Sequence, residues 1–541
     1  MTKEISFGES SAVYAPIRLK TEKGDRLILP IDEGIMLPVE TDDEVLSELS
    51  LLNFSARFCT RVGTLSLILW QHGNMYTALA MDDITIGRYS LIIENRLLTV
   101  EISTVTTENA LLHIFSGSLS EVIQSYRELR RSQGWLVTLE QKSKRLPSVM
   151  RLARSADLWI WQDDFEKLMY SNRDEHIGID TAPIISDILN SMKSAGMDDV
   201  LMSLFFKTDE KVLPEVNRLG YMSTKYDNYN DVPPDELLDF LPRERVEQCD
   251  YLKRRIGDYP DKITMSSSGK LSTAWQLDGT DGKRHSQYTM CPVCALEAMK
   301  NEIPAQTRDK GYSARFIDVF GGSLCECHSP AHPFTRQESV KIKNAAFELL
   351  TDLGLLPGTE DGMEAIIPSL VYNEGMASPV FMRLNWRECG RLKARMYEAP
   401  EETEWFRKYM LNPGWRFPLW ELAARDCVIS FPYWGDSTLC CPEAVNERVL
   451  FSALYGTPPL YSFFAGNWEH LKDMIISSYH RLHPLLQAIS GMAMTDYSII
   501  AEGIYHSEFG SRYRVIANFR ELPYYYNGFM IKAKDFIFHK I

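Results

Sequence analysis

Two acidic residues end neighbouring predicted strands and together have the chemistry that hydrolyses a glycosidic bond. In residues 314–320 (ARFIDVF), strand alternation places Phe316 and Asp318 on one face, and in residues 354–361 (GLLPGTED) it places Glu360 inward as well. Consecutive strands of a βαβ unit lie about 4.8 Å apart. Retaining glycosidases hold two carboxyl groups roughly 5–5.5 Å apart, one attacking the anomeric carbon and the other protonating the leaving oxygen. The pair therefore indicates glycoside hydrolysis, although either residue alone could equally cap a helix or pair with a base.

Aromatic residues stand beside further carboxylates at other predicted strand ends, as in a sugar site, where rings stack on the pyranose and carboxylates accept hydroxyl protons. The candidate substrate-binding residues are Trp161, Asp163, Asp227, Tyr229, Asp231, Glu326, Asp426, Trp434 and Asp436. His328 and His332, which follow Asp318 in the same segment as Glu326, are further candidates to line the pocket. Any single tryptophan is more often a core residue than a sugar platform.

A cysteine cluster offers a competing reading. Cys291-x2-Cys294 is followed by Cys325, Cys327 and His328, and thiolates with an imidazole are the usual ligands of zinc. The spacing is irregular, so ordinary loop packing is favoured, and we expect no metal and no cofactor. The sequence contains no phosphate-binding glycine loop, no dinucleotide fingerprint, no H-E-x-x-H and no G-x-S-x-G motif.

The order of predicted strands and helices around these residues indicates an α/β fold, specifically a (β/α)8 barrel. From about residue 150, apolar strands alternate with amphipathic helices. The predicted strands include residues 156–161, 199–206, 222–231, 314–320, 354–361 and 365–372, and a later one within 419–431. Helices are expected near residues 444–455 and 468–490. An open doubly wound sheet is the alternative.

Segments typical of antiparallel β-strands precede and follow the predicted barrel. Short alternating segments up to residue 118 predict an N-terminal β-sandwich, and residues 119–150 a connector helix and linker. The barrel is then assigned to residues 151–494 and a small C-terminal β domain to residues 495–541.

Composition excludes several classes of function. The 541 residues are 45% hydrophobic and 24% charged, which is typical of packed globular domains. With 58 Lys and Arg against 73 Asp and Glu, the formal charge is -15, so nucleic acid and anionic membranes are unexpected partners. The start of the chain lacks a basic and then apolar run and the cysteines are sparse, so we expect a cytoplasmic protein with reduced thiols. The expected partner is an oligosaccharide or glycoside, and the sequence does not indicate an oligomeric state.

Four segments resemble a known family: RFIDVFGGSLCECHSPAHPFTR, GLLPGTEDG, VYNEGMASP and FPLWELAARDCVISFPYWGD. They are similar to the retaining α-N-acetylgalactosaminidases of glycoside hydrolase family 129, to the related endo-acting family 101 and to uncharacterised bacterial proteins of the same build. The resemblance implies a β-sandwich, a (β/α)8 barrel and a small β domain. It also implies that Asp318 is the nucleophile and Glu360 the general acid/base, and that the segments around Asp227 and Asp426 line the sugar pocket.

The chain departs from this family pattern at a few positions. Arg425 stands where the family leads us to expect His, Asp496-Tyr497 where it leads us to expect a His, and Cys325 where it leads us to expect an aromatic residue. These changes would alter the pocket and hence the sugar specificity. We therefore predict a retaining glycosidase for an α-N-acetylgalactosaminide or a related α-galactoside. The alternatives are a catalytically silent glycan-binding protein on the same barrel, and a metal-dependent enzyme that uses the cysteine cluster.

Overall fold

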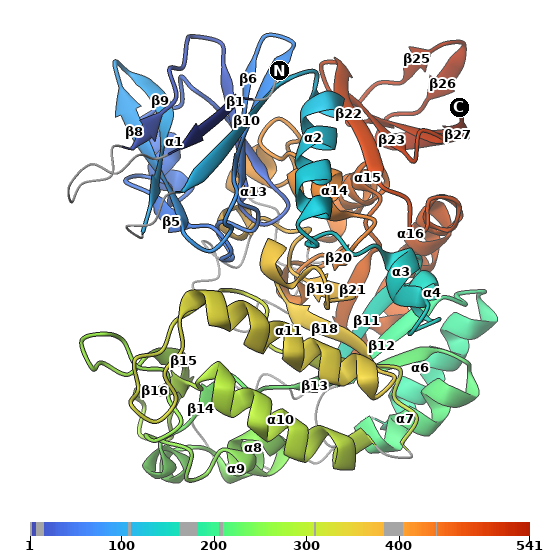
Figure 1. Cartoon of the computed structure of the whole chain (residues 1–541). Helices are drawn as coiled ribbons and strands as arrows, with labels where there is room; N and C mark the ends of the chain where they lie inside the picture. The colour runs from blue at the N-terminus through green and yellow to red at the C-terminus, as the bar shows by residue number, and fades with distance from the viewer. Residues whose placement is uncertain are drawn as a thin grey trace.

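The computed structural model describes most of the chain. The described ranges are residues 3–6, 16–105, 110–161, 182–204, 209–307, 310–383, 404–439 and 441–541. Figure 1 shows the two N-terminal sheets and the C-terminal sheet side by side above the barrel, with helix α2 (Leu119–Ser132) between them. No helix in these ranges is both long and apolar enough to cross a bilayer.

Two antiparallel sheets form the N-terminal part. The first has six strands, in spatial order β1 (Lys3–Ser6), β10 (Leu111–Gly117), β7 (Met75–Met81), β6 (Leu67–His72), β3 (Arg26–Leu29) and β4 (Ile35–Pro38). The second has four, in order β2 (Ile17–Arg18), β9 (Leu97–Thr104), β8 (Gly87–Glu94) and β5 (Ser55–Arg57). A short helix, α1 (Asp43–Glu48), follows β4. Leu27 and Leu79 of the first sheet share one hydrophobic cluster with Tyr89 and Val100 of the second.

Eight parallel strands make the central sheet, which is a nearly closed barrel. Their order is β20 (Ile429–Phe431), β19 (Tyr372–Glu374), β18 (Leu356–Glu360), β17 (Ala314–Ile317), β13 (Met222–Asp227), β12 (Val200–Leu204), β11 (Ala156–Trp161) and β21 (Leu460–Phe464). From β11 to β20 each barrel strand pairs with the next one along the chain, and β21 pairs with β11 rather than with β20. The predicted (β/α)8 barrel between flanking antiparallel sheets is confirmed.

Helices cover the outside of the barrel. They are α6 (Ala182–Ser194), α7 (Asp209–Arg218), α10 (Pro292–Thr307), α11 (Arg336–Asp352), α14 (Leu419–Ala424), α15 (Val445–Tyr455) and α16 (Trp468–Ala488), whereas α13 (Glu404–Tyr409) packs on the N-terminal sheets. The helices α10 and α11 run side by side over the front of the barrel (Figure 1). An insertion between β13 and β17 contains β14 (Asp231–Val232), α8 (Arg243–Gln248), α9 (Asp250–Arg254), β15 (Thr273–Asp278) and β16 (Arg284–Thr289). Its three strands form a separate antiparallel sheet.

Side chains fill the barrel interior in the manner that strand alternation requires. Trp159, Phe316 and Tyr372 belong to one buried cluster inside the barrel, whereas Ile317 belongs to the cluster under the helices. Two short helices, α3 (Leu139–Ser143) and α4 (Val149–Leu152), add Leu139 and other apolar residues to the interior cluster. The connector therefore closes the end of the barrel where the strands begin.

A buried ion pair holds α2, the N-terminal sheets and the barrel together. The Arg130 guanidinium contacts the Glu364 carboxylate, and neither side chain is exposed. Ser66 and Tyr126 also donate hydrogen bonds to Glu364, which belongs to the loop after β18. Every acceptor oxygen of the buried carboxylate is thus satisfied, as a buried charge requires. The N-terminal sheets are in this way fixed against the end of the barrel where the strands finish.

A four-stranded antiparallel sheet ends the chain. Its strands are β22 (Met494–Ala501), β23 (Ile504–Phe509), β24 (Tyr513–Asn518) and β27 (Asp535–Lys540), and a hairpin of β25 (Tyr524–Tyr526) and β26 (Phe529–Ile531) lies beside it. The exact domain boundaries predicted from the sequence stay a prediction.

Two barrel strands differ from the sequence prediction. Residues 365–372 were expected to be a strand, but residues 364–366 form a 3-10 turn and β19 begins only at Tyr372. Pro368 has no N–H to give to a central strand, and the buried ion pair holds Glu364 in the preceding turn. The strand β21 was not predicted; its five apolar or small residues are too short for periodicity to decide.

Candidate active site

Asp318 and Glu360 meet at the mouth of the barrel. Asp318 directly follows β17, and Glu360 is the last residue of the adjacent strand β18. Phe316 and Leu356, which share their strand faces with the two acids, are buried inside the barrel. The two carboxylates therefore extend the interior face of the barrel to its rim.

The two carboxyl groups touch and share a hydrogen bond. Burial raises the pKa of both groups, and the nearby Glu360 carboxylate raises that of Asp318 further. For Glu360, the adjacent Asp361 carboxylate adds to the effect of burial. A hydrogen bond between two carboxyl groups needs one proton, so this contact forms when the pair shares a single proton.

Two polar side chains donate to Asp318. The Tyr226 hydroxyl lies 2.5 Å from Asp318 Oδ2, and Asn228 Nδ2 lies 3.4 Å from the same oxygen. Asn228 Nδ2 also reaches Asp231 Oδ2 at 3.0 Å. Donors aimed at a carboxylate favour its ionised form, so Tyr226 and Asn228 oppose the effect of burial at Asp318.

The N-terminal sheets contribute a guanidinium to the same rim. Arg61 Nη2 lies 3.7 Å from Glu360 Oε1, while Arg61 Nε lies 3.0 Å from Asp361 Oδ2. Arg383 Nη2 approaches the other Asp361 oxygen at 3.7 Å. The shorter distance makes Asp361 the principal partner of Arg61. Because Asp361 largely neutralises the Arg61 charge, Arg61 stabilises the Glu360 carboxylate less than a free guanidinium would.

The chain turns sharply after each of the two acids. Val319 follows Asp318 with φ 48°, and Asp361 follows Glu360 with φ 57°. A β-branched residue such as valine is rarely found in this left-handed region, and such strain gathers at functional sites. Both turns aim the preceding carboxylate into the mouth of the barrel while the backbone leaves it.

An aromatic wall faces the carboxylates. Trp159 and Trp161 of β11 stack with ring centroids 5.2 Å apart, and Trp434 lies 5.9 Å and 5.5 Å from them. Tyr433 contacts Trp434 at 5.1 Å. Trp161 Nε1 donates to Ser462 Oγ at 2.8 Å, which fixes the plane of its ring. Trp434 is the partly exposed member of the group, so it presents the ring surface that a sugar could reach.

A second pair of acids lies beside the first. Glu374 of β19 is the cross-strand neighbour of Glu360, and it is fully buried, as is Asp157 of β11. Burial raises the pKa of Glu374 well above its usual range and that of Asp157 to about 6. The charges of Glu360 and Asp318 raise the Glu374 pKa further. Burial and the neighbouring carboxyl groups thus favour the uncharged form of Glu374.

Replacing Asp157 by asparagine should raise the free energy of unfolding at pH 7 by roughly 1–3 kcal/mol. The folded-state pKa of about 6 exceeds the usual value near 4, so the folded state binds more protons between those pH values. Stability is then lost as pH rises through this window, and asparagine avoids the loss. Urea unfolding at pH 4 and pH 7 should show the gain only at pH 7.

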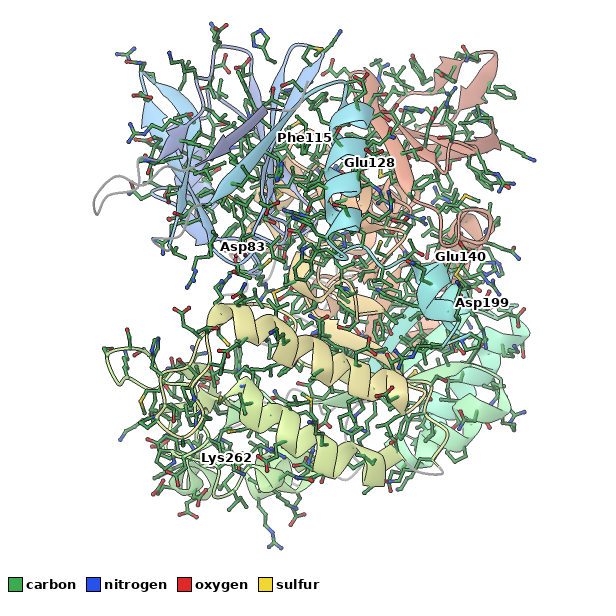
Figure 2. The ribbon with its side chains drawn as sticks, in the orientation of Figure 1. Asp83, Phe115, Glu128, Glu140, Asp199 and Lys262 are labelled. Carbon is green, nitrogen blue, oxygen red and sulfur yellow. The ribbon has the colours of Figure 1, made fainter. Side chains whose placement is uncertain are left out.

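Asp199 is the matched control with the opposite sign (labelled in Figure 2). Although burial opposes it, hydrogen bonds from His483, Arg154 and Arg151 lower the pKa of Asp199 below its usual range. Asp199→Asn should therefore destabilise the protein at pH 7. Equal effects of the two substitutions at pH 7 would contradict the assignment of Asp157.

Comparison with known proteins agrees with this arrangement. Residues 272–503, which include both Asp318 and Glu360, match the family model described as "Glycosyl hydrolases related to GH101 family, GH129". The resemblance to glycoside hydrolase family 129 is confirmed. A search among curated proteins finds no match for the chain.

Solved structures of one glycosidase share this fold. The ligand-free α-N-acetylgalactosaminidase NagBb from Bifidobacterium bifidum superposes with a TM-score of 0.67 at 16% sequence identity, over 92% of this chain and 80% of that one. The GalNAc complex of the same enzyme also gives 0.67, at 15% identity, over 96% of this chain and 82% of that one. At this identity the likeness establishes the fold.

Two of the predicted substrate-binding residues lie on the outer side of the barrel. Asp227 is buried between the Arg315 and Arg254 guanidinium groups, which lower its pKa to about 2 although burial alone would raise it. Tyr229 is fully buried under the guanidinium groups of Arg254 and Arg255, 5.5 Å and 5.3 Å from its ring centroid. On this strand, Tyr226 and Asn228 face the mouth instead.

Four other predicted residues lie at varying distances from the pair. Asp231 is linked to Asp318 through Asn228, and Trp161 and Trp434 belong to the aromatic wall. Glu326 is partly exposed and pairs with Arg57 at 3.3 Å. Asp163 lies outside the described residues.

Asp426 and Asp436, both predicted to bind substrate, form buried ion pairs with arginines instead. Both oxygens of Asp426 accept from Arg127 Nη2, at 2.8 Å and 2.7 Å, which ties α2 to the chain before β20. Asp436 is fully buried and pairs with Arg448 of α15, so it holds the loop that carries Trp434. Neither contact brings a carboxylate to Asp318 or Glu360.

The departures from the family pattern also lie away from the carboxyl pair. Arg425 donates to the carbonyl oxygens of Gly456, Ile489 and Met492, and burial lowers its pKa to about 10. Tyr497 is buried, with its ring 5.2 Å from that of Phe417. Both residues join the barrel to the C-terminal sheet.

Proposed function

We propose that the protein is a retaining glycoside hydrolase that cleaves α-linked sugars, with an α-N-acetylgalactosaminide or a related α-galactoside as substrate. The observation that carries the proposal is the contact between Asp318 and Glu360 at the ends of adjacent strands of a family 129 barrel. The GalNAc and Gal-NHAc-DNJ complexes of the similar NagBb enzyme support the choice of sugar.

Substrate binding begins the reaction by separating the two carboxyl groups. In retaining glycosidases these groups lie roughly 5–5.5 Å apart, further than a direct hydrogen bond allows. When a sugar enters between them, Tyr226 and Asn228 keep donating to Asp318 and hold it as the carboxylate. The shared proton then stays on Glu360, whose charge is disfavoured by burial and by Asp361.

Two displacements follow. The Asp318 carboxylate attacks the anomeric carbon while the Glu360 proton moves to the glycosidic oxygen, and the alcohol leaves. This forms an ester of β configuration between the sugar and Asp318. Glu360, now a carboxylate, takes a proton from a water molecule, whose oxygen attacks the anomeric carbon and releases Asp318. The two inversions return the α configuration, and Glu360 regains its proton.

Two departures from the family pattern, Arg425 and Tyr497, suggested a catalytically silent binding protein, but neither lies near the carboxyl pair. Arg425 and Tyr497 were expected to alter the sugar pocket, but both are engaged between the barrel and the C-terminal sheet. Their side chains contact neither acid of the pair. Within the part of the chain that the structure describes, these two departures therefore give the binding-protein alternative no support.

A small panel of p-nitrophenyl glycosides tests the proposal. The wild type should release p-nitrophenol from an α-N-acetylgalactosaminide or an α-galactoside and not from the β anomers, and NMR should show the α sugar as the first product. A β sugar formed first would show inversion and contradict the mechanism. Binding on a glycan array without hydrolysis of any bound glycan would contradict the enzymatic function itself.

A further inference from the structure

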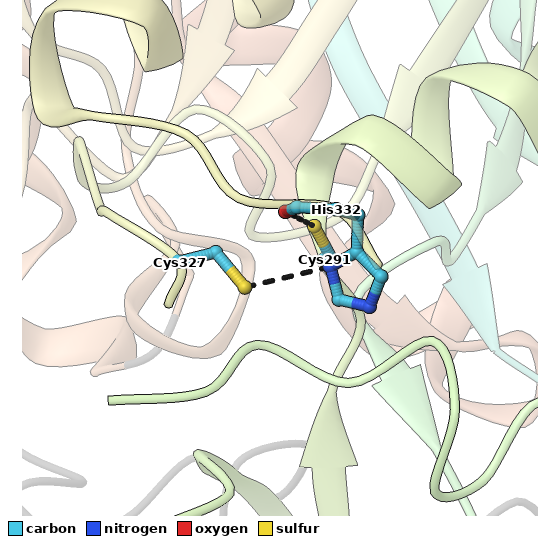
Figure 3. Close-up of side chains that lie close together, drawn as sticks. All are labelled: Cys291, Cys327 and His332. Carbon is cyan, nitrogen blue, oxygen red and sulfur yellow. Dashed lines mark hydrogen bonds between the residues drawn. The ribbon is translucent and has the colours of Figure 1, made fainter. Parts of the chain in front are cut away.

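A cluster of thiols and an imidazole lies beside the loop that follows Asp318. The sulfur atoms of Cys291 and Cys327 and a ring nitrogen of His332 all lie within 4.8 Å of one another. Both cysteines are buried, together with Phe334, in a small hydrophobic cluster of their own. Figure 3 shows the three side chains converging from two separate segments of the chain.

The spacing within the cluster suits a tetrahedral metal ion. Cys327 Sγ lies 3.5 Å from His332 Nδ1. Zinc bonds of about 2.3 Å to sulfur and about 2.0–2.1 Å to nitrogen, at a tetrahedral angle, place these two atoms about 3.6 Å apart. The observed separation thus equals one edge of a zinc tetrahedron.

The outer contacts orient the ligand atoms. His332 Nε2 lies 2.9 Å from the Asp261 carbonyl oxygen, which can only accept, so Nε2 carries the proton and the Nδ1 lone pair faces Cys327. The Met265 amide donates to Cys327 Sγ at 3.4 Å. These contacts orient the imidazole and one sulfur towards each other.

Cys294 supplies a fourth donor. Its thiol is in hydrogen-bonding contact with Cys291, and its side chain packs against the cluster of Cys291, Cys327 and Phe334 from the first turn of α10. Lys262, labelled in Figure 2, accepts a hydrogen bond from the Cys291 amide through its carbonyl oxygen.

We propose that Cys291, Cys294, Cys327 and His332 bind one structural zinc ion. Three thiolates and an imidazole are ligands that select zinc, and four protein ligands leave no open position for catalysis. The site thus differs from the one considered in the sequence: Cys325 faces Ser339, and His328 is exposed. It also replaces the expectation that the protein binds no metal, and it does not depend on the proposed glycosidase activity.

The ion would join two segments that also meet through the hydrogen bond from the Cys291 thiol to the His332 carbonyl oxygen. Cys327 and His332 belong to a tight hairpin closed by the bridge between Cys327 and Phe334, in the loop after β17. Cys291 and Cys294 begin α10, directly after the inserted sheet. Zinc would therefore fix the loop that leaves Asp318 against the insertion. We assign it the role of positioning this loop and no step in the reaction.

Metal content of the purified full-length protein tests the proposal. Elemental analysis should find one zinc per chain after dialysis, and cobalt(II) exchange should give the visible absorption of a tetrahedral thiolate site. Cys294→Ser and His332→Ala should retain less than about a tenth of the wild-type zinc. Cys325→Ser and His328→Asn, which change non-ligands in the same segments, should retain all of it.

Two further measurements keep the test decisive if a ligand variant fails to fold. His332→Cys should keep one zinc and shift the cobalt spectrum towards that of a four-sulfur site. In the wild type, Cys291, Cys294 and Cys327 should resist alkylation until a chelator is added, as mass spectrometry of their peptides would show. Protein grown in zinc-rich medium that contains no stoichiometric metal would overturn the proposal, as would a Cys291–Cys294 disulfide or unchanged zinc in Cys294→Ser and His332→Ala.

Discussion

Asp318→Ala should lower kcat/KM for a p-nitrophenyl α-glycoside by roughly 10⁴-fold or more, because no other carboxylate among the described residues is placed to form the glycosyl ester. Asp231 is separated from the reacting position by Asn228, and Glu374 is fully buried, which disfavours its charged form. The measurement is steady-state hydrolysis by wild type and variant at the pH optimum of the wild type.

Azide distinguishes loss of the nucleophile from general damage. In Asp318→Ala, azide can occupy the space left by the carboxylate and attack the anomeric carbon of an α-glycoside, which gives the β-glycosyl azide. Recovery of activity with this product would identify Asp318 as the nucleophile. Formation of the α-glycosyl azide would instead assign it the acid/base role and contradict the mechanism.

The variant should also be at least as stable as the wild type. The folded-state pKa of Asp318 is raised by burial and by Glu360, so its charge opposes folding as pH rises above the usual carboxyl pKa. Removing the carboxyl group ends that opposition at neutral pH. Catalytic residues often trade stability for function in this way. A sharp fall in melting temperature would mean that lost activity reflects unfolding.

Strand alternation was enough to predict from the sequence that Asp318 and Glu360 lie together at the rim of the barrel. Residues two positions apart in a strand point to the same face of the sheet. Asp318 therefore points to the same side as Phe316, and Glu360 to the same side as Leu356. The same rule applied to β13 would have selected Tyr226 and Asn228. The aromatic and acidic composition of the segment drew attention to Asp227 and Tyr229 instead, whose alternate positions turn them outward to arginines.

Other parts of the site depend on contacts that no local pattern encodes. Arg61 reaches Glu360 and Asp361 from the N-terminal sheets, across about 300 positions of sequence. Glu374 was missed because the sixth strand was expected at residues 365–372, before the position where β19 begins. His332, rather than His328, joins the cysteine cluster because a hairpin turns the chain back after Cys327. Each case needs tertiary structure, since sequence distance and spatial distance differ.

Glu360→Ala should reduce activity in proportion to the need of the leaving group for a proton. Aryl glycosides such as p-nitrophenyl substrates leave as stable anions and should keep a large part of the first displacement, whereas a glycoside of an alkyl alcohol such as serine should lose roughly 10²–10⁴-fold. The basic limb of the pH dependence of kcat/KM should disappear as well, because in the wild type that limb reports deprotonation of Glu360, whose pKa is raised by burial and by Asp361.

Asp361→Ala is the control for this assignment, since Asp361 is adjacent and equally acidic. Asp361 is almost fully buried and pairs with both Arg61 and Arg383. Loss of the Asp361 carboxylate should leave two guanidinium groups beside Glu360 and lower the Glu360 pKa, so the basic limb should move to lower pH but persist.

Azide should restore activity to Glu360→Ala and not to Asp361→Ala. The product should be the α-glycosyl azide, because Asp318 still forms the first ester. If instead Asp361→Ala lost its basic limb and spared only aryl glycosides, then Asp361 would be the acid/base and the alternation that selected Glu360 would have chosen the wrong neighbour.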